Sequence, residues 1–286
     1  MYLPMKMIPS IELLLQQYKT DKWWKYLSAN PNAYTLLSSN QEKIDWIYLS
    51  KNTHPIAILS LKFADECHLS WIHLSKNPEA MSILHLNPKK IFWITLSSNT
   101  SPEAIDLLEE NPEKIHWSRL SENPSAMKIL KAYPEKIVWE RLCLNPAHEA
   151  IVTLLDNKEN IYWTTLSLNP SPFAVELLKS NPNNIDWYNL SKNPSPLAFE
   201  LLKNNVDKVD WFALSFNSNP QVIELFVEYE HLYKHDLESG KTNISHLLQQ
   251  PYIFNYDYEK MKQTMNILRE ELICRWIDNE NKDMLE

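Results

Sequence analysis

Tryptophan recurs along this chain of 286 residues at a nearly constant interval of 22 to 25 residues. Around each of nine tryptophans the pattern W-x-x-L-S-x-N returns, and only its serine changes once, to Cys143. A repeat of about 20 to 50 residues is typical of stacked arrays, in which each unit buries its apolar face against its neighbours. The nine are Trp24, Trp46, Trp71, Trp93, Trp117, Trp139, Trp163, Trp187 and Trp211.

One repeat contains the pattern of two helices. Trp187 and Leu190 are three residues apart, which places them on one face of a short helix. Ser195 and Pro196 then provide a capping residue and a proline suited to the first position of a second helix. We therefore expect an all-α fold, a solenoid of about nine helix-turn-helix repeats, with helices of about two and about three turns.

The flanks differ from the repeats and predict three segments. Residues 1–22 contain an apolar stripe that predicts an N-terminal capping helix, and residues 23–227 hold the nine repeats. Residues 228–286 contain methionine, leucine and tryptophan at spacings of three and four, which predicts a C-terminal helical capping segment. Terminal caps cover the open ends of a solenoid. Binding of a partner by the C-terminal segment is the alternative.

Composition restricts the class of protein. A formal net charge of -8 disfavours general binding to nucleic acid, because that binding depends on lysine and arginine. Three scattered cysteines, Cys67, Cys143 and Cys274, fit neither a disulfide framework nor a zinc site and indicate a reducing compartment. We find neither an apolar run long enough for a membrane span nor a signal peptide pattern, so we expect a protein that is neither secreted nor membrane-bound.

Four segments carry a resemblance to a known family. The units LSANPNAYTLLSSNQEKIDW and LSKNPSPLAFELLKNNVDKVDW are followed by PYIFNYDYEKMK and ILREEL near the C-terminal end. Together they resemble the short α-helical repeat proteins that large DNA viruses of amoebae encode in many copies. The resemblance covers nearly the whole chain. It implies a viral protein that acts in the host cytoplasm, or is part of the virion, and it implies no catalytic residue.

The repeated tryptophans and asparagines have a structural interpretation that we prefer. We expect the tryptophans to lie in the core, although exposed rings could stack on bases or methylated lysines. The asparagines six residues after each tryptophan are expected to satisfy turn amides rather than bind a ligand. With one glycine against 18 prolines, turns should use proline and asparagine, the latter in the left-handed conformation. Ala174 and its equivalents should lie at close helix contacts.

Catalytic, cofactor and metal sites are not predicted. A chain with one glycine has no glycine-rich phosphate loop, and no nucleophile motif is present. His231 and His235 are four residues apart and could share a helical face with Glu228, a spacing that some metal sites use. A single pair without further ligands is weak, so we interpret these histidines as surface or packing residues.

A variable ridge is the predicted interaction surface. Positions one and five after each tryptophan should point away from the stack, and toward the C-terminal end they become apolar. Exposed apolar patches usually mark interaction sites, while cover by the C-terminal segment is the alternative. The predicted partner-binding residues are Leu144, Leu168, Tyr188, Phe212 and Phe216.

The repeat pattern favours a non-enzymatic scaffold or adaptor that binds host or viral proteins. A modular RNA-binding protein is the first alternative, but the ridge positions change from lysine to glutamate and leucine along the chain. A structural component of the virus particle is the second. Partner identity, oligomeric state and the handedness of the solenoid are left open by the sequence.

Overall fold

The computed structural model describes residues 24–229, which form an all-α solenoid without strands. The predicted N-terminal cap at 1–22 lies outside the described residues, as does all but the start of the predicted C-terminal cap at 228–286. The chain divides into two compact units, residues 1–186 and 187–286, and each is described by itself. The predicted fold class is confirmed for the described residues.

Every repeat begins its first helix at the tryptophan. These first helices have four to six residues. They are shorter than the expected two turns, which would need about seven residues. In unit 1 they are α2 (Trp24–Ala29), α4 (Trp46–Leu49), α6 (Trp71–Lys76), α8 (Trp93–Leu96), α10 (Trp117–Glu122), α12 (Trp139–Leu142) and α14 (Trp163–Leu166). In unit 2 they are α16 (Trp187–Lys192) and α18 (Trp211–Leu214).

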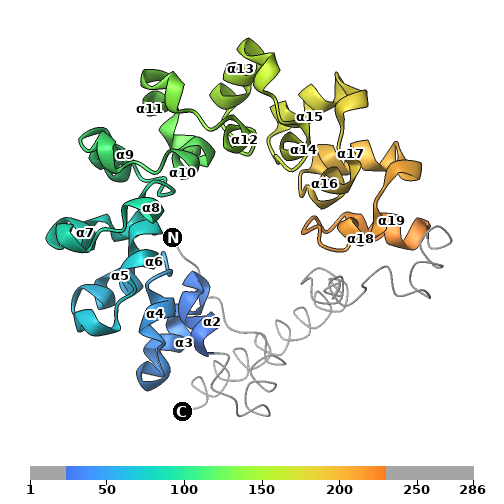
Figure 1. Cartoon of the computed structure of the whole chain (residues 1–286). Coiled ribbons are helices and arrows are strands. Elements are labelled where there is room, and N and C mark those ends of the chain that lie inside the picture. The colour runs from blue at the N-terminus through green and yellow to red at the C-terminus, as the bar shows by residue number, and fades with distance from the viewer. Residues whose placement is uncertain (1–23, 230–286) are drawn as a thin grey trace, which may run out of the picture. The chain divides into compact units, whose positions relative to one another are not determined.

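The second helices are five to nine residues long. In Figure 1 the first helices α4 to α14 form one row of unit 1, and the second helices α5 to α15 form another row beside it. The second helices are α3 (Tyr34–Ser38), α5 (Pro55–Lys62), α7 (Met81–Leu86), α9 (Pro102–Glu109), α11 (Met127–Ala132), α13 (His148–Asp156) and α15 (Pro172–Lys179) in unit 1, and α17 (Pro196–Lys203) and α19 (Val222–Glu228) in unit 2.

A third element, which the repeat pattern did not predict, ends each of the first eight repeats. It is a single turn of 3-10 helix, an element that often follows or connects α-helices. These turns are η3 (Gln41–Lys43), η4 (Glu66–His68), η6 (Pro88–Lys90), η7 (Pro112–Lys114), η9 (Pro134–Lys136), η10 (Lys158–Asn160), η11 (Pro182–Asn184) and η12 (Val206–Lys208). In repeats with a short step a further turn precedes the second helix: η2 (Pro31–Ala33), η5 (Pro78–Ala80) and η8 (Pro124–Ala126).

The repeated leucine and alanine form the core. The leucine three residues after each tryptophan is fully buried from Leu49 onward, and the alanine at or just before the start of the second helix is fully buried from Ala57 to Ala198. A larger side chain at a fully buried position would have to displace its neighbours. The predicted role of these alanines agrees with this burial.

The tryptophans are less buried than we expected. Only Trp211 is buried, and the other eight are half-buried at the edge of the core. Each of these tryptophans is the first residue of its helix. The regular spacing of tryptophan thus indicates the same position in every repeat, but it does not indicate full burial.

The recurring asparagine joins successive repeats. The Nδ2 group of Asn145 donates to the backbone oxygens of Ser121 and Asn123 in the preceding repeat, at 3.0 and 2.9 Å. Its Oδ1 accepts from the backbone N–H of Ala147, which closes the turn before α13. Buried carbonyl and amide groups are costly when unpaired, so one side chain satisfies three of them. The same pattern recurs in unit 1 at Asn52, Asn77, Asn99, Asn123 and Asn169, and in unit 2 at Asn217.

The recurring serine forms a second bridge. Ser121 Oγ donates to the carbonyl of Trp117 within its own helix, and accepts from the backbone N–H of Val138 before the next tryptophan. Where Cys143 replaces serine, its Sγ accepts from Tyr162 N–H at 3.3 Å. Thus the serine and asparagine of the repeat pattern both have structural roles.

Two expectations about turns are corrected. The asparagines that close the second helices do not adopt the left-handed conformation; Asn111, for example, has φ of -131°. Its side chain caps the helix instead, because Nδ2 donates to the carbonyl of Leu107 at 2.9 Å. We also expected serine to cap the second helix after the longer turns, and Ser101 does, but Ser171 and Ser195 make no such bond. There the repeat asparagine accepts from the N–H of the serine itself, at 2.9 Å for Ser171 and 3.0 Å for Ser195.

Candidate functional site

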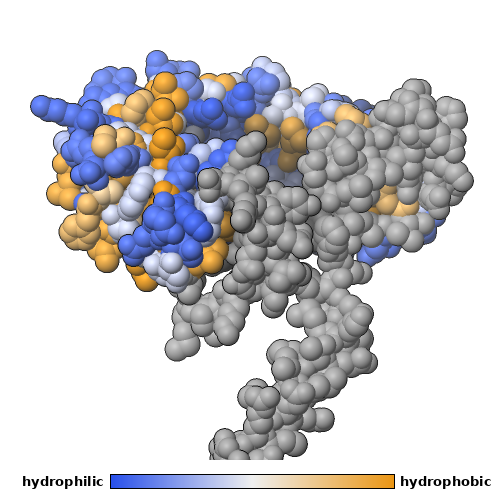
Figure 2. Space-filling view, turned by 90° about the horizontal axis from the view of Figure 1, so that it is seen from below, coloured by the Kyte–Doolittle hydropathy of each residue, from blue (hydrophilic) through white to orange (hydrophobic). Residues whose placement is uncertain are grey.

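Apolar side chains are exposed at many places on unit 1. Figure 2 shows hydrophobic surface broken into separate patches by hydrophilic surface, on the side where the first repeats lie. Phe63 and Leu86 are the most exposed large apolar side chains among the described residues, at 83% and 76%. Scattered exposure of this kind is ordinary, so a site needs a concave arrangement as well.

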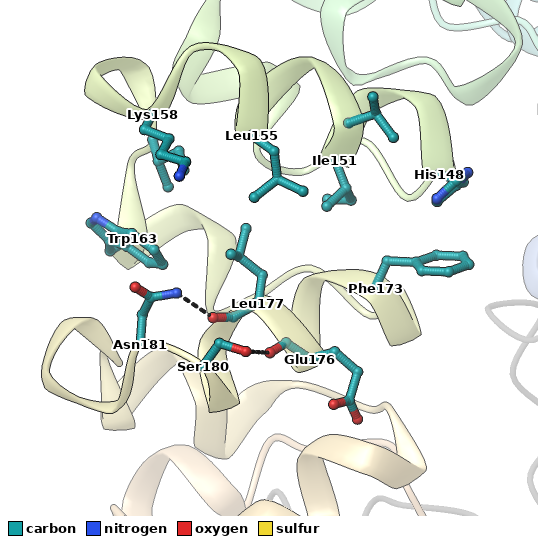
Figure 3. Close-up of a pocket in the computed structure, with 12 residues that line it drawn as sticks. His148, Ile151, Leu155, Lys158, Trp163, Phe173, Glu176, Leu177, Ser180 and Asn181 are labelled. Carbon is teal, nitrogen blue, oxygen red and sulfur yellow. Dashed lines mark hydrogen bonds between the residues drawn. The ribbon is translucent and has the colours of Figure 1, made fainter.

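One such arrangement is a groove of about 440 Å³ between α13 and α15. We call it the α13–α15 groove, and Figure 3 shows its walls: α13 on one side and α15 on the other. Leu155 and Leu177 face each other across it, and Trp163 closes one end. The lining residues are His148, Ile151, Val152, Leu155, Lys158, Ile161, Trp163, Phe173, Glu176, Leu177, Ser180 and Asn181.

The groove is apolar along its middle and polar at its ends. Val152, Leu155 and Phe173 keep 41%, 40% and 49% of their surface exposed. At one end the rings of His148 and Phe173 lie 4.2 Å apart between centroids. At the other end Lys158 and Trp163 lie near each other in the close-up, and Asn181 donates to the carbonyl of Leu177. Apolar walls with a few polar groups at fixed places are typical of binding sites.

The indoles of six other repeats are covered by a ring contact. Lys43, Lys90, Lys114 and Lys208, each the last residue of a 3-10 turn, place Nζ at 4.4 to 5.8 Å from the ring centroids of Trp24, Trp71, Trp93 and Trp187. Tyr133 and Phe226 contact Trp117 and Trp211 instead. A cation within about 6 Å of an indole face is attracted by the ring quadrupole.

Trp46, Trp139 and Trp163 have no such ring contact within residues 24–229. At the position of the covering lysine the chain has His68 after Trp46, Asn160 after Trp139 and Asn184 after Trp163. Trp163 lines the α13–α15 groove, and Trp139 lines a smaller one of about 230 Å³ between α11 and α13. Both grooves therefore lie where asparagine replaces the covering lysine.

Only some of the five predicted ridge residues are exposed. In unit 1, Leu144 and Leu168 are half-buried, so neither is a prominent exposed residue. In unit 2, Tyr188, Phe212 and Phe216 are exposed, and Lys192 Nζ lies 3.9 Å from the Tyr188 ring centroid and 5.9 Å from that of Phe216. The rings of Phe212 and Phe216 are 5.2 Å apart. The ridge in unit 1 is most exposed at residues that we did not select: Ile47, Ile72 and Ile94.

Two groups with a shifted pKa lie outside the groove. Burial, followed by the positive charge of Lys51, lowers the pKa of His73, which lies in α6. Burial raises the pKa of the Cys143 thiol, which keeps it protonated and unreactive. Within the described residues no three His, Cys, Asp or Glu side chains gather as metal ligands would, and His231 and His235 lie outside them. None of the described helices has the length and apolar character to cross a membrane.

No protein-family model, curated protein or solved structure matches this chain. Its function therefore has to be inferred from its geometry. That geometry offers a repeated scaffold whose polar positions hold the layers together, and an apolar groove that ends at an uncovered indole.

Proposed function

We propose that this protein is a non-enzymatic scaffold that binds another protein in the α13–α15 groove. The observation that carries the proposal is the row of exposed apolar side chains, Val152, Leu155 and Phe173, along a groove that Trp163 closes. Its volume of about 440 Å³ suits a few side chains of a bound segment rather than a whole domain.

The rest of the repeat supports a scaffold. The recurring serine and asparagine form hydrogen bonds with backbone groups inside the array. These are the polar residues that a reaction or a ligand repeated in every unit would need. Function is then left to surface side chains that differ between repeats, as in other solenoids. The cluster of Tyr188, Phe212 and Phe216 in unit 2 is a second surface that such a scaffold offers.

We place this scaffold in the cytoplasm of a cell infected by a large DNA virus. The support is the resemblance of its repeat units and closing segment to virus-encoded repeat proteins. A host or viral protein is then the expected partner. The net charge of -8 supports a protein rather than a nucleic acid.

The test is affinity capture from infected-cell lysate with wild type and three variants. Leu155→Glu places a charge in the groove, and Leu86→Glu places the same charge on an exposed leucine of α7 as the control. Phe212→Asp with Phe216→Asp tests the unit 2 cluster. We expect one protein to be captured by wild type and by the Leu86 variant but lost with the Leu155 variant. Equal capture by all four proteins, or salt-sensitive capture of RNA alone, would contradict the proposal.

A further inference from the structure

Trp163 lines the α13–α15 groove, and the equivalent tryptophans of other repeats show which group can lie over an indole at this position. In four repeats a lysine of the same repeat lies over the indole, with Nζ at 4.4 to 5.8 Å from the ring centroid. Trp163 begins α14 as those tryptophans begin their own helices, so it occupies the same position in its repeat. An indole in this position is therefore able to hold a cation.

In the repeat of Trp163 the lysine is missing. Its place at the end of η11 is taken by Asn184, whose amide carries no charge. Lys158 lines the same groove from η10, but among the described residues no ring contact joins it to Trp163. The ring thus has room for a cation that comes from outside the chain.

The groove next to the ring is apolar, and its rim carries charges of both signs. Leu155 and Leu177 face each other beside Trp163 and would hold an apolar side chain. Of the charged side chains on these elements, only Lys158 and Glu176 line the groove. Glu176 is paired with Lys179 at 2.7 Å, and Glu149 of α13 is paired with Lys131 at 3.1 Å. The preference for a cation therefore rests on the indole of Trp163.

We infer that the α13–α15 groove binds a segment of a protein that carries an apolar side chain beside a lysine or arginine, whose cation lies over Trp163. The inference rests on the proposed function and adds the chemistry of the partner. The cation takes the place that the chain's own lysine takes in four other repeats. The apolar side chain lies between Leu155 and Leu177.

The test uses the full chain and a defined probe. The probe is the capped peptide Leu-Ala-Lys-Ala-Leu, with matched peptides that carry norleucine or glutamate in place of lysine. Binding is measured by NMR at the indole N–H of Trp163, assigned with Trp163→Phe. We expect the lysine peptide to bind about 2- to 30-fold more tightly than the norleucine peptide, because a cation over an indole contributes about 0.5 to 2 kcal/mol.

Two variants that differ in the position of one charge give the sharpest control. Asn184→Lys restores the covering lysine and should remove the preference for the lysine peptide. Asn183→Lys adds the same charge one residue earlier, at an exposed position, and should keep that preference. Asn160→Lys covers Trp139 instead and should also keep it. Equal behaviour of the variants at residues 183 and 184 would overturn the inference.

The result also separates the inference from the proposed function. If lysine and norleucine peptides bind equally and Leu155→Glu abolishes both, the groove binds protein segments but the cation has no role, so the inference fails alone. If no peptide binds, or if only an RNA oligonucleotide or an anionic vesicle does, the inference is also wrong. The capture experiment then decides the scaffold function independently.

Discussion

The side-chain amide of Asn145 donates a hydrogen bond of 2.9 Å to the backbone carbonyl of Asn123, its own equivalent one repeat earlier. Asn123 in turn donates to the carbonyl of Asn99 at 2.8 Å, so the bonds run as a continuous ladder through unit 1. Each rung is buried and joins two layers of the solenoid. Contacts between neighbouring repeats are the source of stability in such arrays.

Loss of one rung should therefore be costly. We expect Asn145→Ala to lower the free energy of unfolding by about 2 to 4 kcal/mol, because it removes three buried or part-buried hydrogen bonds, to the carbonyls of Ser121 and Asn123 and from the N–H of Ala147. Urea denaturation followed by circular dichroism measures the change. Asn157→Ala is the control: its amide bonds only within its own helix, to Thr153, and we expect a loss of about 1 kcal/mol. Equal losses would contradict a role between layers.

Cys143 is the one departure from serine in the repeat pattern. A sulfur is a weak acceptor, and its bond from Tyr162 N–H is longer than those of the serines. We expect Cys143→Ser to raise the free energy of unfolding by up to about 1 kcal/mol, since Oγ then bridges as in other repeats. Chemical denaturation measures the change. A loss of stability of the same size would show that the site prefers the larger, less polar sulfur.

Close approach of helices at the repeat alanine predicts intolerance to size. Ala174 is fully buried in α15, so we expect Ala174→Leu to destabilise the protein by about 1 to 3 kcal/mol through overpacking. Glu176→Leu, at an exposed position of the same helix, should change stability by no more than about 0.5 kcal/mol. Thermal unfolding measures both variants, and a harmless leucine at residue 174 would show spare volume in the core.

His73 should make stability depend on pH. Burial first, and then the charge of Lys51, lowers its pKa in the folded protein, so the unfolded chain binds the proton more readily. This contribution is present above the ordinary histidine pKa of about 6.5 and is lost as the pH falls below it. We expect His73→Gln to lose less stability than wild type between about pH 7 and pH 5. Denaturation curves at these two pH values test this, and parallel losses would contradict it.

Most of the fold could be predicted from the sequence, because the same pattern occurs nine times and each copy supports the same two-helix interpretation. The two-helix repeat and the structural role of Asn145 follow from residues that recur at fixed spacing, whereas the bridge made by Ser121 was not predicted. The 3-10 turns did not follow, since three residues are too few to show a periodic pattern. The left-handed turn was wrong because the side chain of Asn111 caps its helix without needing that conformation.

The groove was missed, although the sequence carried a signal for it. A lysine recurs at the end of the repeat, at Lys43, Lys90, Lys114, Lys136 and Lys208, and is replaced at His68, Asn160 and Asn184. Without the structure nothing shows that this lysine contacts the tryptophan about 20 residues earlier in four of these repeats. The ridge residues were chosen from their positions after the tryptophan and from their apolar character, but Leu168 is half-buried because packing, which sequence spacing does not show, covers it.

The position of the bound cation tests the central claim most directly. Intermolecular nuclear Overhauser effects between the lysine side chain of the peptide and the indole of Trp163 would locate it. We expect such contacts, with upfield ring-current shifts of the lysine ε protons, in wild type and in Asn183→Lys, and their loss in Asn184→Lys. Lysine protons that contact no part of Trp163, or contacts that persist unchanged in Asn184→Lys, would contradict the claim.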